Sequence, residues 1–299
     1  HFGTEMYNNG GVYGEYAALD REGRKWKVVY DGSIATECTA GRLRESVSSR
    51  EYSAEIVSPI CRYGDIPEIQ QVVRELRAAG AVSNSSCGIH VHVDASPFTA
   101  DKLRNVANIM ASKEDLIYKT LKVDVERENC YCGKTDLRWL ETLNSQRPKT
   151  LDEVKNIWYG GDSGRSGDHY DNSRYKGLNL HSVFNKGTIE FRLFNSDIQH
   201  AGKVRAYVTL CLAITAQALN QTCASRRKTQ STNEKYTFRT WLLRLGLIGD
   251  EFKAVRQHLL ENLDGCIAWK DPAQAEAQRE RLRKAREPPQ TRQPITMTM

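Results

Sequence analysis

The sequence contains two stretches that alternate polar and apolar residues, Cys87-Gly88-Ile89-His90-Val91-His92-Val93-Asp94 and Gly187-Thr188-Ile189-Glu190-Phe191-Arg192-Leu193-Phe194. Successive side chains of a β-strand point to opposite faces, so each stretch predicts a strand with one apolar face that packs inward. The opposite face of the first strand carries His90 and His92, and that of the second carries Glu190 and Arg192. Imidazoles, a carboxylate and a guanidinium in these places favour a site for a metal ion and an anion over a solvated surface.

Length and composition indicate a soluble globular protein. The chain has 299 residues, 39% hydrophobic and 27% charged, which is enough for a sizeable core in one large domain with a trailing segment. The net charge of +6 permits attraction to phosphate groups, but it does not choose between a nucleotide, a nucleic acid and a membrane surface. The densest basic cluster, Arg279 to Arg286, is interleaved with glutamates, as on a solvated helix. A nucleic-acid partner is therefore not expected.

Cysteine spacing and hydropathy exclude two further classes. Only Cys130 and Cys132 lie close together among the eight cysteines, so a structural zinc site is not expected. No apolar run reaches the ~20 residues needed to cross a bilayer, and the first residues do not have the pattern of a signal peptide. We therefore expect a cytoplasmic protein with reduced thiols and without a membrane partner.

Local patterns predict the elements around the two strands. Further strands are expected over residues 2–7, 12–19, 25–31, 54–58 and 178–183, the last forming a hairpin with residues 187–194 through a turn at Asn185-Lys186-Gly187. Helices are expected over residues 65–80, 99–121, 150–159, 204–219 and, broken at 246–249, 236–260. Asp65 and Glu68 resemble a capping box. The stretch 160–170 is expected to be a mobile loop able to act as a lid, and the last dozen residues to be disordered.

Polar residues of several strands point to a common site. If the strands share one sheet, they bring one set of side chains to one face, namely Glu5, Glu55, His90, His92, Glu190 and Arg192. Such carboxylates and imidazoles suit Mg²⁺ or Mn²⁺, which favour oxygen ligands, accept some nitrogen and keep positions open for phosphates. An arginine suits a phosphoryl group because its charge is permanent.

In combination these residues resemble the putative amidoligase family, which belongs with glutamine synthetase and the glutamate-cysteine ligases among ATP-dependent carboxylate-amine ligases. The likeness runs from Phe2 to about Ala218 and is carried by Phe2-Gly3-Thr4-Glu5, Asp31-Gly32-Ser33, Glu55-Ile56-Val57-Ser58-Pro59, the histidine strand, Arg127, Tyr175 with Asn179, and Gly187-Thr188-Ile189-Glu190-Phe191-Arg192. The resemblance implies an α+β fold with a glutamine synthetase-like curved, largely antiparallel sheet, helices on its outer face and an ATP site on its inner face.

The resemblance also implies a reaction and its participants. ATP would activate a small-molecule or peptide carboxylate as an acyl phosphate, and an amine would capture it as an amide, with a glutamyl group as the family-level expectation for the acid. Carried over by position, the metal ligands are Glu5, Glu55, His92 and Glu190, with His90 as a second imidazole or substrate contact. Arg192 is the phosphate-stabilising cation, and Arg127, Tyr175 and Asn179 are nucleotide or substrate contacts. Kinship with glutamine synthetase leaves room for a homo-oligomer.

One position departs from the family pattern. Family members commonly carry a second glutamate two residues after the first, where this chain has Tyr7. Glu15, Asp31 or Glu37 could replace that ligand, or the site could hold fewer metal ions. A catalytically degenerate binding protein is the corresponding alternative, because function belongs to a site and does not follow from a fold.

Two other functions account for part of the pattern. His-Val-His fits the metal motif of replication and mobilisation endonucleases, which cleave single-stranded DNA with a tyrosine such as Tyr170 or Tyr175. A zinc hydrolase could use the same histidines, although zinc usually recruits a compact third ligand.

We predict three segments: a catalytic domain over residues 1–225, a helical extension packed on it over 226–270, and a charged helix and tail over 271–299.

Overall fold

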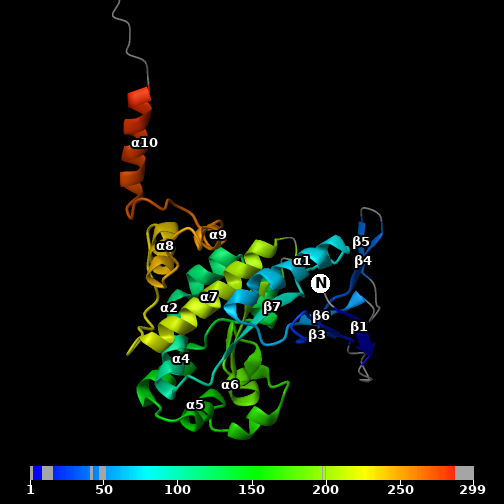
Figure 1. The fold of residues 1–299 in the computed structure, drawn as a ribbon. Coiled ribbons are helices and arrows are strands. Elements are labelled where there is room, and N and C mark those ends of the chain that lie inside the picture. The colour runs from blue at the N-terminus through cyan, green and yellow to red at the C-terminus, as the bar shows by residue number, and fades with distance from the viewer. Residues whose placement is uncertain are drawn as a thin grey trace, which may run out of the picture.

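The computed structural model describes residues 3–8, 16–40, 43–46, 52–196, 198 and 200–286, and over these residues the chain is an α+β protein with antiparallel sheets (Figure 1). A four-stranded sheet has the order β1-β2-β3-β6, β4 pairs with β5, and a third sheet has the order β7-β9-β8. The strands are β1 Gly3–Asn8, β2 Tyr16–Leu19, β3 Lys25–Val29, β4 Glu37–Ala40, β5 Leu43–Ser46, β6 Glu55–Val57, β7 Gly88–Asp94, β8 Leu178–Asn179 and β9 Thr188–Asn195.

The expected single sheet differs from this arrangement. The described strands form three sheets, and β6, which carries Glu55, pairs with β3 and not with β7. The sequence pattern specifies which face of a strand is apolar, but it does not specify which strands become neighbours. The α+β class is confirmed, and the glutamine synthetase-like sheet stays a prediction.

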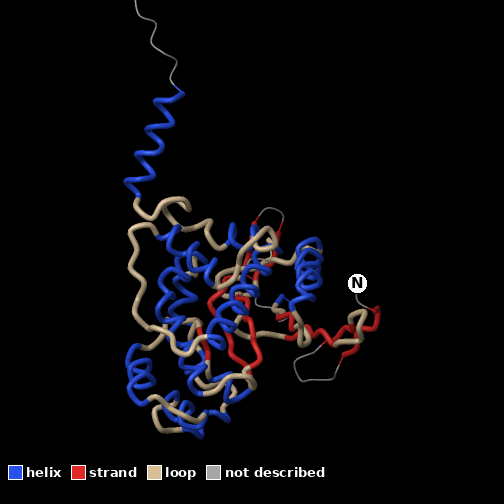
Figure 2. The backbone as a smooth tube through the Cα atoms, turned by 60° about the vertical axis from the view of Figure 1, so that its left-hand side comes forward, coloured by secondary structure: helices blue, strands red, loops and turns tan. Residues whose placement is uncertain are grey.

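The core lies between the third sheet and two long helices. The apolar residues of β9, Ile189, Phe191 and Leu193, are each at most 1% exposed. Helices α2, Ala100–Leu121, and α7, Ala201–Asn220, pack against each other and against this sheet, as Figures 1 and 2 show. Each fully buried large apolar side chain contributes roughly 1.5–3 kcal/mol. The apolar face of β9 is thereby fixed inward, and its polar face is turned away from the two helices.

The connection between β8 and β9 is a helix, so the predicted hairpin is wrong. Residues His181–Lys186 form the short helix α6. The backbone N–H of His181 donates to Oδ1 of Asn179 at 2.9 Å, which satisfies one of the free donors at the helix start. Gly187 ends the helix with φ of 71°, a backbone conformation that favours glycine. The turn residues therefore mark a helix end and not a two-strand turn.

The start of α1, Ile66–Ala78, also differs from its predicted capping box. Pro67 has no N–H to donate, and the Asp65 carboxylate instead accepts from the backbone of Arg62 and from Arg24, both at 2.7 Å. Arg24 also contacts Glu68 at 2.9 Å. This charged cluster joins the first sheet to α1.

The remaining helices are η2 Tyr63–Asp65, α3 Val125–Cys130, α4 Leu137–Gln146, α5 Leu151–Trp158, η3 Ser163–Gly167, η4 Asn172–Arg174, α8 Glu234–Arg244, α9 Lys253–His258 and α10 Pro272–Arg286. Of these, α5, α8, α9 and α10 lie in segments that were predicted to be helical, whereas α3, α4 and the 3-10 helices η2, η3 and η4 were not predicted. Residues of α8 and α9 share the main hydrophobic core, whereas α10 extends away from the body in both views (Figures 1 and 2). Within the described part of the chain, no helix has the length and apolar character needed to span a membrane. The segment boundaries at 225 and 270 stay predictions, and the tail beyond residue 286 lies outside the described residues.

Candidate functional site

Strand pairing brings the two histidines to Glu190. β7 and β9 are antiparallel, and His92 lies opposite Glu190. The register shifts between Ile89 and Val91, which face Phe194 and Phe191, so β9 contains one extra residue at this point. Such a bulge redirects side chains, and here His90 also approaches Glu190.

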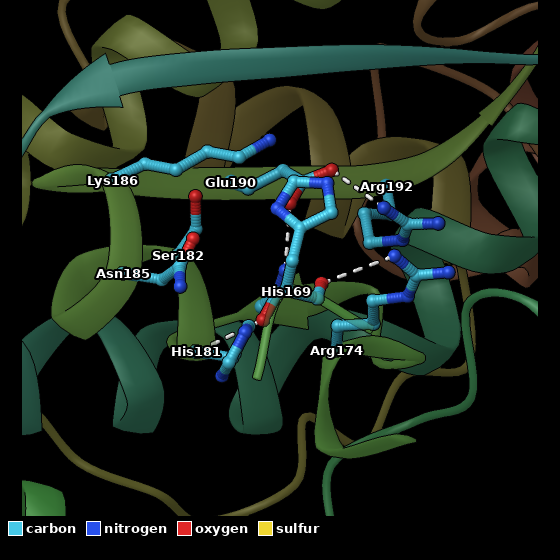
Figure 3. A pocket seen from close by; sticks show the side chains of 9 residues that line it. His169, Arg174, His181, Ser182, Asn185, Lys186, Glu190 and Arg192 are labelled. Carbon is cyan, nitrogen blue, oxygen red and sulfur yellow. Dashed lines mark hydrogen bonds and ion pairs between the residues drawn. The ribbon is translucent and has the colours of Figure 1, made fainter. Parts of the chain in front are cut away.

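The Glu190 carboxylate is the centre of the site (Figure 3). Its Oε1 accepts a hydrogen bond from Nη1 of Arg192 at 2.7 Å, and its Oε2 accepts from Nδ2 of Asn179 at 2.6 Å. Oε1 also lies 3.4 Å from Nδ1 of His90 and 3.6 Å from Nε2 of His92. Glu190 is only 4% exposed, so these groups replace the water that would otherwise solvate it.

Charge states follow from these contacts. Burial alone raises the pKa of Glu190, but the charge of Arg192, the two histidines and the Asn179 hydrogen bond outweigh it and hold the pKa below its usual value. Burial lowers the pKa of His90 strongly, helped by the charge of Arg192, and burial also lowers that of His92. At neutral pH the site therefore contains an ionised carboxylate, a guanidinium and two uncharged imidazoles.

A chain of hydroxyl groups orients His92. Its Nδ1 lies 2.8 Å from Oγ1 of Thr188, which in turn lies 2.9 Å from Oγ of Ser182. The contact leaves Nε2 facing Glu190. Fixing one ring nitrogen so that the other faces the site is how proteins orient a ligand histidine.

Glu55 reaches the same electrostatic environment from the first sheet. Burial and the carboxylates of Asp31 and Glu190 raise its pKa, against the opposing effect of Lys186 and Arg192. Asp31, one of the candidates to replace the missing glutamate, is therefore close enough to Glu55 to influence it. A carboxyl whose pKa is raised by neighbouring carboxylates is typical of sites that bind cations or share a proton.

With this geometry established, comparison with known proteins identifies the family. A model of the family described as putative amidoligase enzyme matches residues 2–215, which cover every residue placed in the site above. The chain belongs to this family. Membership supports ligase activity in general. No curated protein and no solved structure matches the chain.

The donor set of this amidoligase-family chain suits a hard divalent cation in part. The oxygens of Glu190 and Glu55 and the uncharged imidazoles are ligand types that Mg²⁺ and Mn²⁺ accept. However, no group of three or more His, Cys, Asp or Glu within the described residues is arranged to hold a metal ion. Glu5 lies in β1, but its side chain is outside the described residues, as are Tyr7 and Glu15. The metal ligands therefore stay a prediction.

Two of the predicted nucleotide or substrate contacts lie next to the ion pair of Glu190 and Arg192. Asn179 holds Glu190 directly, and the ring of Tyr175 lies 5.8 Å from the guanidinium carbon of Arg192. Arg127 is different, because it is 2% exposed and donates to the backbone carbonyls of Ser86 and Arg192. In this structure Arg127 lies beneath β7 and β9 and binds their backbone. Its contact with a ligand stays a prediction.

A cleft opens beside Glu190 and contains residues that the sequence pattern did not single out. We call it the α6 cleft, and its lining is His169, Arg174, Asn179, His181, Ser182, Asn185, Lys186, Glu190 and Arg192 (Figure 3). The loop that was expected to be a lid contributes His169 and packs on α6 through η3. Lys186 extends along β9 toward Glu190 (Figure 3). The only sequence signal for Lys186 was its place directly before the Gly-Thr-Ile-Glu-Phe-Arg motif, where it was interpreted as a turn residue.

Proposed function

We propose that this chain is an ATP-dependent carboxylate-amine ligase that forms an amide bond through an acyl phosphate, with a glutamyl carboxylate as the expected acid. Family membership supports the ligase class. The finer assignment is supported chiefly by the ion pair between Glu190 and Arg192, in which Nη1 and Oε1 are 2.7 Å apart. A buried, permanently charged guanidinium held in place beside uncharged imidazoles suits the stabilisation of a transferring phosphoryl group.

Arg192 is positioned before any ligand arrives. Its side chain is 12% exposed, its Nη1 is bound to Glu190, and its guanidinium lies beside the ring of Tyr175. A cation fixed in this way needs little reorganisation when charge develops. In the proposed first step an oxygen of the acid attacks the γ-phosphorus and the bond to ADP breaks, while Arg192 stabilises the charge on the phosphoryl oxygens.

The other polar residues bind and orient in this proposal. His90 is a weak base because its pKa is strongly lowered by burial and Arg192, so it contacts the substrate or a cation and does not take the proton of the amine. Mg²⁺ or Mn²⁺, held by Glu5, Glu55, His92 and Glu190, would neutralise phosphate charge when bound. In the second step the amine nitrogen attacks the acyl carbon, the bond from that carbon to the phosphate oxygen breaks, and the proton of the amine passes to the departing phosphate or to water.

Release of ADP from ATP by the purified chain tests this proposal. ADP is measured with Mg²⁺ or Mn²⁺ and a pool of amino acids and polyamines, for wild type, Glu190→Ala and Arg192→Ala. Arg138→Ala is the matched control, because Arg138 is an exposed arginine of α4 outside the site. We expect amine-stimulated ADP release that both site variants lose and the control retains. Loss of a charged group from a phosphoryl-transfer site costs about 10³-fold or more.

Two results would overturn the ligase proposal. ATP that neither binds nor turns over in the presence of either metal ion would leave a degenerate binding protein. Cleavage of single-stranded DNA would favour the endonuclease, and Tyr170→Phe and Tyr175→Phe would then identify the nucleophile. Circular dichroism of each variant shows whether it is folded, so that loss of activity is not confused with loss of structure.

A further inference from the structure

The α6 cleft carries more positive charge than its carboxylates neutralise. Glu190 is the acidic residue of its lining, and Glu190 is already paired with Arg192. Two further cations, Arg174 and Lys186, line the same cleft. Arg174 donates to the carbonyl of His169 and to the hydroxyl of Tyr175, which are both uncharged. The lining itself therefore carries a net positive charge, and Glu55, which lies outside the lining, is close enough to Lys186 to interact with it.

Arg165 already binds one of the carboxylates that lie near the cleft, Asp171. Asp171 accepts two hydrogen bonds from Arg165, at 2.7 and 3.0 Å, and one from the backbone of Ser173 at 2.8 Å. A carboxylate that accepts from two nitrogens of one guanidinium forms a bidentate ion pair. Asp171 is thus unable to neutralise Arg174 or Lys186.

His181 adds a hydrogen-bond donor. It is 3% exposed and lines the cleft, and its Nε2 forms no hydrogen bond of normal geometry among the described residues. Burial lowers its pKa, against the opposing effect of the nearby backbone of Asp168. Its Nδ1 is bonded to the hydroxyl of Tyr159. When the Tyr159 hydroxyl donates to Nδ1, the ring proton is on Nε2, and in this tautomer Nε2 is a donor toward the cleft. Nε of Arg174 is a second buried donor without a partner.

From these contacts we infer that the α6 cleft binds a small oxyanion through Arg174, His181 and Lys186. Buried N–H donors without partners are costly, and an oxyanion would satisfy them together with the two cations. The cleft is small and open to solvent, with a volume of about 30 Å³, which suits a single small group such as a carboxylate or a phosphate.

The inference deepens the proposed function and rests on it for the source of the anion. Two substrates of the proposed reaction carry such a group: the acid through a carboxylate, and the nucleotide through its terminal phosphate. Arg192 and Glu190 form the wall that the cleft shares with the site of phosphoryl transfer. An anion held by Arg174 and Lys186 would thus lie next to the reacting groups.

Direct binding measurements test the site without turnover. Inorganic phosphate and acetate are titrated by calorimetry into wild type, Arg174→Gln, His181→Phe and Lys186→Gln. Lys149→Gln is the matched control, because Lys149 is an exposed lysine outside the cleft. We expect each cleft variant to weaken binding about tenfold or more, and the control to change it by less than about twofold. Lys186 is exposed, so its variant is expected to fold even if a buried one does not.

The same variants distinguish the source of the anion. L-glutamate and ATP are titrated separately, and weakening confined to glutamate assigns the cleft to the acid, whereas weakening confined to ATP assigns it to the nucleotide. Failure of wild type to bind either probe at about 10 mM, or equal affinity of wild type and all cleft variants, would overturn the inference. Binding that depends on Arg174 and Lys186 without any ADP release would leave the anion site standing and refute the ligase. ADP release in which the cleft variants behave as wild type would leave the ligase proposal standing and refute a role for the cleft in the reaction.

Discussion

Arg127 lies so close beneath Gly88 that a Cβ atom at residue 88 would stand 2.2 Å from its Nη2. The guanidinium is buried and donates to the carbonyls of Ser86 and Arg192, so it is unable to retreat without losing these bonds. We expect Gly88→Ala to lower the free energy of unfolding by about 1–3 kcal/mol, because extra volume in a packed region displaces its neighbours. Urea denaturation measures this change.

A double-mutant cycle provides the control for Gly88. In an Arg127→Met background the same Gly88→Ala substitution meets no guanidinium and should cost much less. Equal costs in the two backgrounds would show that the close approach of Gly88 and Arg127 is not the cause.

Two substitutions of Asn179 distinguish the loss of its hydrogen bonds from the addition of a charge next to Glu190. Asn179→Ala removes the hydrogen bonds to Glu190 and to the backbone of His181, and should cost about 1–3 kcal/mol. Asn179→Asp instead places a second carboxylate against Glu190, which raises the pKa of the pair. A carboxyl pair with a raised folded-state pKa destabilises the protein once both groups ionise. We therefore expect Asn179→Asp to be less stable at pH 8 than at pH 5, relative to Asn179→Ala, in thermal unfolding. Parallel pH profiles for the two variants would contradict this.

Acid sensitivity should depend on the turn between β2 and β3. Burial raises the pKa of Asp20, but hydrogen bonds from Arg24, Trp26 and the backbone of Glu22 outweigh it and hold the pKa below its ordinary value of 3.8. A carboxyl with a lowered folded-state pKa stabilises the protein above its unfolded pKa, and this stability is lost as the pH falls through the folded pKa. We expect Asp20→Asn to lower the Tm at pH 7 and to weaken the loss of Tm on acidification below about pH 4.

The exposed aspartate Asp250 provides the comparison for Asp20. Asp250→Asn should leave the acid limb of the Tm profile unchanged. If Asp20→Asn has the same profile as wild type, the Asp20 cluster does not govern acid unfolding.

The segment after α7 depends on a buried amide of α2. Asn105 is 1% exposed, donates to the carbonyl of Gln221 at 2.9 Å and accepts from the backbone of Ala224 at 3.0 Å. Asn105→Ala should cost about 1–3 kcal/mol and release this segment locally. Trypsin should then cut faster at Arg226 and Arg227, while cleavage within α10 serves as the internal reference. An unchanged ratio of the two rates would show that other contacts hold the segment.

Local sequence was sufficient to predict much of the secondary structure. The strands β7 and β9 follow from alternation over a few residues, and α5 starts at Thr150, whose hydroxyl accepts from the backbone of Glu153. These features depend on residues close together in the chain, and a sequence pattern records such relations directly. Glu190 and Arg192 lie on a single strand, so their predicted pairing also depends on residues close together in the chain.

Contacts between distant segments decided the rest. The helix at residues 181–186 is a local exception: Asn179 and Gly187 fix its two ends, but the same local residues also fit a hairpin turn. Glu55 came to lie in a separate sheet, because edge pairing depends on which strands meet and not on their own periodicity.

The sequence by itself determined the α+β class, the family and the polar strand faces that contain His90, His92, Glu190 and Arg192, since family motifs and strand periodicity are local properties. Tertiary structure alone decided that the pKa values of Glu190, His90 and His92 all lie below their ordinary values, because burial and neighbouring charges set these shifts. It also placed Arg174, His181 and Lys186 in one cleft. Arg174 comes from η4 and the other two residues from α6, and the positions of these short elements depend on the packing of the whole domain.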